Sequence, residues 1–345
     1  MGRMLKWLLL GLAAVAAVVV FATGGRPPEL TSVTAPFKSL DLAGLPAPGM
    51  LQTGRGAPLA FRHYPARDAT MVALTLHGAA GRSEAMHPLA RSLQAAGIAV
   101  YAPDLRGHGQ SAPLGDVAFA GQIEDDLELL IAEARNAYPA ANVALVGFSA
   151  GGGQAIKFGG GKKGHNADVL VLVAPALGRQ APDKARGEAW AKVHPARIAV
   201  LRALQAIGLS AAGGMEAIGF ATPADGSMQP SGYSLRLLED LMPDDYAASL
   251  KAVVRQTFVV LGEKDELFDA ETVRQAFLAA RPAASVTIVP GLGHAALALS
   301  PAGHAAVLAA LKGEAVESRP DPSDTDESRI APPGYVAVPT PPQPE

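Results

Sequence analysis

The residue best suited to chemistry in this sequence is Ser149, at the centre of the stretch GFSAG at residues 147–151. It follows the apolar run 142–148 (NVALVGF), which is typical of a buried strand, and it precedes an Ala/Gly-rich stretch that is expected to be helical. A serine on a sharp turn from strand to helix exposes its hydroxyl, and glycines flank it because larger side chains would collide there. The pattern predicts a nucleophile that forms an acyl-enzyme.

A serine hydroxyl is a poor nucleophile until a base removes its proton, so a histidine must lie near Ser149 in the fold. His294, in PGLGHAAL, follows the last apolar run and is the favoured base. The carboxylate that fixes its tautomer is expected after an intervening strand, where TFVVLGEKDELF offers Asp265. Glu263 and Glu266 are neighbours that could serve instead. We expect His304, His165 and His194 to be solvated, because His304 lies in the terminal helix and the other two lie in polar stretches.

Two backbone N–H groups are also needed to bind the oxyanion of a tetrahedral intermediate. The N–H of Ala150 follows the nucleophile at the start of a helix. The second donor is expected from HGAAG at residues 77–81, where small side chains allow the backbone to approach a substrate, and we assign it to Ala79. The alternative is that His77 and Gly78 form only a tight turn.

Short apolar runs alternate with helical patterns on both sides of this serine. The runs expected to be strands are 70–77, 98–103, 142–148, 168–174, 257–261 and 285–289, and the clearest helical stretches between them are 84–96 and 119–138. Such alternation predicts a mostly parallel sheet with helices on both faces. Ligands bind at the carboxyl ends of strands in such sheets, which is where the candidate residues fall.

Composition excludes several other classes of protein. Of 345 residues, 49% are hydrophobic and 18% are charged, so wholesale disorder is excluded. The net charge of -3 gives no electrostatic basis for binding nucleic acid. Because the chain has no cysteine, it can form neither a disulfide nor a thiolate metal site. We expect no cofactor and no metal.

The motifs together resemble the α/β-hydrolase superfamily, especially its monoacylglycerol lipase, lysophospholipase and serine aminopeptidase-like branch. They are LTLHGAAG, YAPDLRGHGQS, GFSAGG, GEKDELF and GLGH, and the similarity covers residues 58–313. The resemblance implies a triad of Ser149, Asp265 and His294, in the chain order of that fold. It also implies that Ala79 and Ala150 form the oxyanion hole and that His108 is structural. The serine argues against the dehalogenase and epoxide hydrolase branches, which use aspartate at this place.

Residues 175–256 interrupt the strand alternation where this superfamily inserts a cap. Helical stretches at 196–207 and 233–241 flank a Gly-rich segment with apolar residues such as Met215 and Phe220. These apolar residues either grip an acyl chain or seal a small core within the cap. Carboxylates that could hold a substrate amine are Glu216, Asp225, Glu239, Asp240, Asp244 and Asp245.

The two ends of the chain differ in composition from the segment between them. The stretch 7–25 has no charge and follows Arg3 and Lys6, which predicts a membrane-spanning helix that leaves the rest of the chain outside the cytoplasm. A cleaved signal peptide, giving a secreted or periplasmic protein, is the alternative, and a mature N-terminus near Thr23 would establish it. Residues 26–57 are expected to be a tether, and the Pro-rich, acidic residues 314–345 a disordered tail.

The sequence thus predicts a membrane-anchored serine hydrolase that cleaves carboxylic esters, including lipid-like acyl esters. Ester cleavage is favoured because the cap is apolar and an alcohol is the easier leaving group. A serine aminopeptidase or amidase is the alternative, and transfer of the acyl group to an acceptor other than water would use the same residues. A catalytically inactive, membrane-tethered binding module is a further alternative. Fold and triad alone do not identify the substrate.

Overall fold

The core of the protein is an eight-stranded sheet in the order β1-β2-β4-β3-β5-β6-β10-β11. The computed structural model describes residues 18–19, 25–27, 30–182, 191–221 and 229–314. The six strands from β4 to β11 in that order are parallel, and β1 and β2 pair antiparallel at one edge. The strands are β1 Gly49–Leu51, β2 Leu59–Tyr64, β3 Met71–Leu76, β4 Ala99–Pro103, β5 Asn142–Phe148, β6 Val169–Val173, β10 Gln256–Gly262 and β11 Ser285–Val289.

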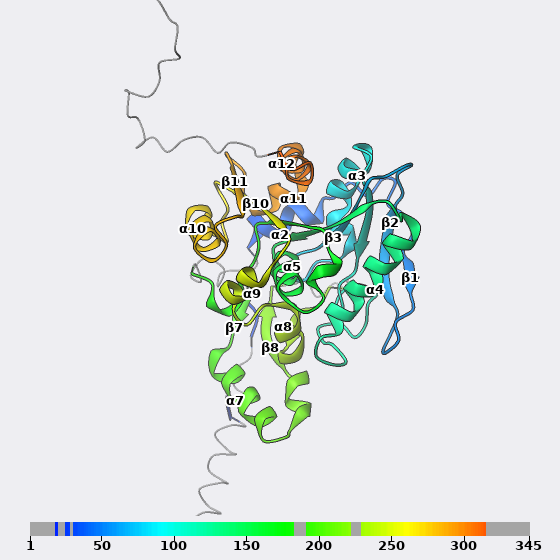
Figure 1. The fold of residues 1–345 in the computed structure, drawn as a ribbon. Coiled ribbons are helices and arrows are strands. Elements are labelled where there is room, and N and C mark those ends of the chain that lie inside the picture. The colour runs from blue at the N-terminus through cyan, green and yellow to red at the C-terminus, as the bar shows by residue number, and fades with distance from the viewer. Residues whose placement is uncertain (1–17, 20–24, 28–29, 183–190, 222–228, 315–345) are drawn as a thin grey trace, which may run out of the picture.

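Helices cover both faces of this sheet, as the sequence predicts (Figure 1). One face packs against α4 (Gln122–Ala137), α5 (Ala150–Gly160), α9 (Tyr246–Ala252) and α10 (Ala270–Ala280). The other packs against α2 (Thr31–Lys38), α3 (His87–Ala95), α11 (His294–Leu299) and α12 (Pro301–Leu311). In β5 the side chains of Val143 and Leu145 enter the first core, whereas those of Val146 and Phe148 enter the second. Apolar residues on both sides of a strand are what a doubly covered sheet requires.

The cap lies between β6 and β10 and contains strands that the sequence did not predict. Beside α7 (Pro195–Ala206) and α8 (Leu235–Leu241), it has a three-stranded antiparallel sheet. Its strands are β7 (Ala191–Val193), β8 (Glu216–Phe220) and β9 (Gly232–Ser234). The expected helices of the cap are present, but its strands were missed, because strands of three to five residues are too short to establish a period of two. Figure 1 shows α7 projecting away from the main sheet.

The segment expected to be a tether is partly folded onto the domain. Within residues 26–57, α2 packs against α11, and β1 extends the sheet by pairing with β2. Most of the predicted membrane segment and residues 315–345 lie outside the described residues. In the part of the chain that is described, no helix is both long and apolar enough to cross a membrane.

A buried ion pair fixes the loop after β4 to α4. The Arg106 guanidinium is fully buried and donates to both carboxylate oxygens of Asp126, at 2.8 and 2.9 Å. It also donates to the carbonyl oxygens of Pro58 and Ala112, so its main donors are occupied. Burial raises the pKa of Asp126, although Arg106 opposes this effect. The loop that carries the RGHG motif is thus tied to α4 through the buried Asp126 carboxylate, which Arg106 neutralises at close range.

Replacing Arg106 by leucine is expected to lower the free energy of unfolding by about 3–5 kcal/mol, because the buried Asp126 loses its partner. Urea unfolding followed by circular dichroism measures this change. Arg274→Leu is the control: it removes an exposed pair with Glu271, and such pairs contribute only about 0–1 kcal/mol. Equal destabilisation by the two variants would contradict the role given to the buried pair.

Candidate active site

Ser149 lies on a strained turn between β5 and α5. Its φ of 53° and ψ of −116° place a non-glycine residue in a region that favours glycine. The turn is held by its own backbone, since the Ser149 N–H donates to the Val173 carbonyl at 2.9 Å and the Ser149 carbonyl accepts from Ala176 at 2.9 Å. A Cβ at Gly147 would collide with the backbone of Gly151. The two glycines are therefore sterically required, and the serine side chain remains partly exposed.

His294 and Asp265 form a buried hydrogen-bonded pair near this turn. The Nδ1–H of His294 donates to Oδ2 of Asp265 at 2.8 Å, and both side chains are almost completely buried. Oδ1 of Asp265 accepts from the N–H groups of Leu267 and Phe268, at 2.8 and 3.0 Å. The carboxylate is thus held through both oxygens, and the His294 ring presents Nε2 on its opposite side.

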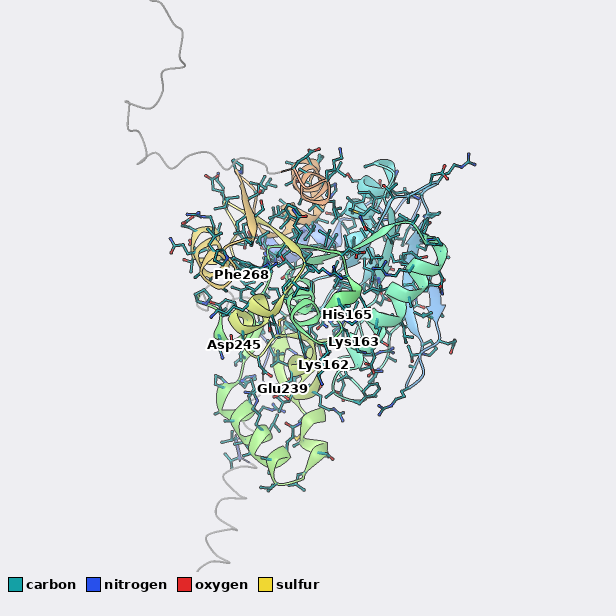
Figure 2. The ribbon with its side chains drawn as sticks, in the orientation of Figure 1. Lys162, Lys163, His165, Glu239, Asp245 and Phe268 are labelled. Carbon is teal, nitrogen blue, oxygen red and sulfur yellow. The ribbon has the colours of Figure 1, made fainter. Side chains whose placement is uncertain are left out.

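Aromatic rings hold the His294 imidazole in place beside the turn that carries Ser149. Its ring lies 4.9 Å from that of Phe148, the residue before Ser149, and 5.3 Å from that of Phe268, measured between centroids. Phe268 is labelled in Figure 2, on the side of the molecule that carries α10. In this structure no hydrogen bond joins Ser149 to His294. Hydrogen bonds between catalytic groups are often long without substrate and tighten in the reacting complex.

The two alternative carboxylates have other roles. Glu263 accepts from the N–H of Gly291 at 2.7 Å, and Glu266 accepts from the backbone N–H of His294 at 2.8 Å. Both therefore hold the loop that carries the histidine, whereas only Asp265 reaches the imidazole ring. The structure distinguishes three acids that the sequence left as alternatives.

The HGAAG loop lies directly against Ser149. A Cβ on Gly78 would approach the Cβ of Ser149 to 3.2 Å, so the backbone of Gly78 lies close to the Ser149 side chain. Gly78 accepts at its carbonyl from the N–H of Gly81 at 3.1 Å and from Nδ1 of His77 at 2.8 Å. Within the described ranges no acceptor binds the N–H of Ala79, and the N–H of Ala150, in the first turn of α5, has no intrahelical acceptor. Both donors are thus available for an oxyanion.

His77 and His108 are buried and uncharged. His77 accepts at Nε2 from the N–H of Leu105 at 3.0 Å, so its proton is on Nδ1. Burial lowers the pKa of His77, and burial together with the nearby His77 ring lowers the pKa of His108 to about 3. Nε2 of His108 lies 2.6 Å from the hydroxyl of Tyr233 on β9. His108 therefore has the structural environment that the family resemblance implies.

Three further histidines test the expectation of solvated side chains. His165 is exposed, as expected. The expectation was wrong for His304 and His194, which are both buried. His304 faces α11, where its Nε2–H donates to the carbonyl of Ala298 at 2.9 Å.

Most acidic groups of the cap are engaged in contacts that stabilise it. Figure 2 labels two of them, Glu239 in α8 and Asp245 at the start of α9. The contacts are Glu216 with Arg26, Glu239 with Arg202, Asp240 with the N–H groups of Gly121 and Ile123, and Asp245 with the N–H of Ala248. Asp225 lies outside the described residues. Four of the six carboxylates that could hold a substrate amine therefore already have partners.

The two apolar residues singled out in the cap pack into different cores. Met215 packs against a cluster formed by Leu201, Ala212, Ala217 and Leu235. Phe220 is buried and meets the Tyr233 ring edge to face, with centroids 4.7 Å apart. Met215 thus seals a small core within the cap, whereas Phe220 joins the core that covers one face of the main sheet. Within the described ranges, no group of three or more His, Asp or Glu side chains is arranged to hold a metal ion.

The fold and these motifs define an α/β-hydrolase. Residues 67–298 match the family described as "Serine aminopeptidase, S33", and the chain belongs to this family. The match covers well over half of the sequence and includes the turn at Ser149, the cap and the loop that carries His294. The resemblance inferred from the sequence motifs, to the monoacylglycerol lipase and serine aminopeptidase-like branch of the α/β-hydrolases, is confirmed.

Individual relatives point to the same branch. The chain is 33% identical over 138 residues to a monoacylglycerol lipase of Mycolicibacterium smegmatis, an alignment covering 34% of this chain and 48% of that protein. The chain therefore spans about half the length of this curated relative. A monoglyceride lipase of Saccharomyces cerevisiae has a TM-score of 0.60 at 16% identity, with 80% of this chain and 97% of that chain covered. An esterase of Thermogutta terrifontis has a TM-score of 0.54 at 17% identity, with 77% and 98% covered. At these identities the two structures support the fold alone.

Proposed function

We propose that the protein is a serine hydrolase that cleaves carboxylic esters through an acyl-enzyme on Ser149. The observation that carries this proposal is the strained turn that exposes Ser149 against the backbone of Gly78. Strain at a non-glycine residue persists only where the surroundings enforce it, and it clusters at functional sites. The buried pair of His294 and Asp265, next to that turn, supports the same role.

In the proposed reaction, Ser149 Oγ attacks the ester carbonyl carbon while Nε2 of His294 takes the hydroxyl proton. Asp265 stabilises the imidazolium because its carboxylate accepts from Nδ1. The N–H groups of Ala79 and Ala150 bind the oxyanion. The C–O bond then breaks, and His294 returns its proton to the leaving alcohol. Water releases the acyl group from Ser149 by the same steps in the second half of the reaction.

Amide hydrolysis is the second candidate, because the family description names a serine aminopeptidase. An aminopeptidase needs a carboxylate free to hold the substrate's amino group. The acidic residues of the cap that could do so are mostly paired with arginines or backbone N–H groups. This pairing favours ester cleavage, as does the monoacylglycerol lipase among the relatives.

The test is a panel of p-nitrophenyl acyl esters of increasing chain length beside amino-acid p-nitroanilides. Each buried CH₂ contributes about 0.8 kcal/mol, so kcat/KM is expected to rise at least about tenfold from two to eight carbons. Anilides are expected to be the poorer substrates. Equal activity across chain lengths would contradict the preference for lipid-like esters, and faster cleavage of anilides than of esters would identify an aminopeptidase or amidase.

A further inference from the structure

The side chain of Tyr233 joins the cap to the HGAAG loop. This residue lies on β9 and is 1% exposed. Its hydroxyl oxygen lies 2.7 Å from the backbone nitrogen of Ala80 and 2.6 Å from Nε2 of His108. A residue of the cap therefore contacts the loop that borders Ser149.

The surrounding groups fix the direction of these hydrogen bonds. Nδ1 of His108 faces the carbonyl oxygens of Leu105 and Arg106, at 3.2 and 3.1 Å, so this nitrogen carries the proton. Nε2 of the neutral ring is then an acceptor. The Tyr233 hydroxyl accordingly donates to His108 and accepts from the Ala80 N–H. No other arrangement satisfies all the groups.

The N–H that Tyr233 holds belongs to a residue with a strained backbone. Ala80 has a φ of +52°, which costs an L-residue energy unless its neighbours enforce it. Ala80 follows Ala79 directly, so its backbone conformation helps to set the orientation of the Ala79 N–H. Holding Ala80 therefore positions the donor that the proposed function assigns to the oxyanion.

Tyr233 itself is firmly placed. The next residue, Ser234, donates from its N–H to the carbonyl of Gly115 at 2.8 Å and from its hydroxyl to Asp116 at 2.5 Å. Arg236 donates to the same carboxylate at 2.6 Å. Gly115 and Asp116 follow the RGHG loop that carries His108. Tyr233 thus spans two loops of the main domain from a strand that is anchored to one of them.

We infer that Tyr233 is a positioning residue, which holds the oxyanion loop through Ala80 and so couples docking of the cap to assembly of the oxyanion hole. The inference rests on the proposed function. It predicts that loss of the Tyr233 hydroxyl weakens binding of the transition state more than binding of the substrate. A residue needed only for stability would not produce this difference.

The experiment compares Tyr233→Phe with the wild-type full-length chain on a p-nitrophenyl acyl ester. We expect kcat to fall about 10- to 100-fold, in the range caused by a misplaced catalytic group, while KM changes by less than about threefold. The inhibition constant of an alkyl trifluoromethyl ketone, whose adduct with Ser149 carries an oxyanion, is expected to rise by the same factor as kcat/KM falls.

Tyr64→Phe is the matched control. Tyr64 is equally buried and its hydroxyl also bonds a histidine, Nδ1 of His87 at 2.8 Å, but it belongs to the core on the opposite face of the sheet. It is expected to keep kcat and ketone affinity within about threefold of the wild type. Equal losses in Tyr233→Phe and Tyr64→Phe, or a rise in KM at constant kcat, would overturn the inference. An inactive wild type would instead overturn the proposed function.

A second pair of variants tests the same link if Tyr233→Phe does not fold. His108→Gln keeps an acceptor oxygen for the Tyr233 hydroxyl, whereas His108→Leu removes it. We expect the glutamine variant to retain at least about tenfold more activity than the leucine variant. Equal activity of the two at equal thermal stability would overturn the inference.

Discussion

Replacing Ser149 by alanine is expected to lower kcat for ester hydrolysis by roughly 10⁵- to 10⁶-fold. Loss of the nucleophile in a serine triad has an effect of this size, because no neighbouring group forms the acyl-enzyme in its place. The residual rate comes from the oxyanion donors and from substrate binding, which the substitution leaves intact. Measurements of p-nitrophenyl ester cleavage give the ratio directly, and a fluorophosphonate probe reports the nucleophile independently.

The control is Ser39→Ala, which removes an exposed hydroxyl at the end of α2. This variant is expected to be labelled by the fluorophosphonate as the wild type is, whereas Ser149→Ala is not labelled. Equal labelling of wild type and Ser149→Ala would exclude Ser149 as the nucleophile. Absence of both labelling and turnover in the wild type would favour a binding module.

The parallel part of the sheet could be predicted from the sequence because its strands are continuous apolar runs. The expected strands 142–148 and 285–289 coincide with β5 and β11. Strand β2 was missed because it carries Arg62 and His63, whose polar groups interrupt the apolar pattern. Arg62 is nonetheless buried, and its guanidinium donates to Ser83 and Glu84. The partners that offset burial of the Arg62 charge lie about twenty positions away in the sequence, so no local pattern indicates them.

In the candidate site, too, some residues could be predicted from the sequence and others could not. Ser149, His294 and the HGAAG loop each follow a strand, so local pattern and the geometry of parallel sheets indicate them. Tyr233 has no such signal, because it lies in a short strand of the cap and its partners are 125 and 153 residues away in sequence. Position in a motif thus predicts groups that act on the substrate, whereas groups that hold those motifs in place emerge only from the three-dimensional structure.

Replacing Asp265 by asparagine is expected to lower kcat by about 10⁴-fold while the fold is retained. The amide oxygen can still accept from the N–H groups of Leu267 and Phe268, so the loop remains in place. The amide nitrogen, however, would face Nδ1 of His294 and favour the tautomer whose proton is on Nε2. That tautomer cannot take the proton of Ser149, and the imidazolium also loses its counter-charge.

Glu266→Gln is the matched control for this prediction. Glu266 is the next residue, it also contacts His294, and the change also removes one negative charge. Its contact is with the backbone N–H, which an amide oxygen can accept equally well, so kcat is expected to stay within about tenfold of the wild type. A larger loss in Glu266→Gln than in Asp265→Asn would transfer the role of the acid to Glu266. Asp265 contacts the ring of His294, whereas Glu266 contacts its backbone. Comparing the two variants therefore separates the orientation of the base from the loss of one nearby negative charge.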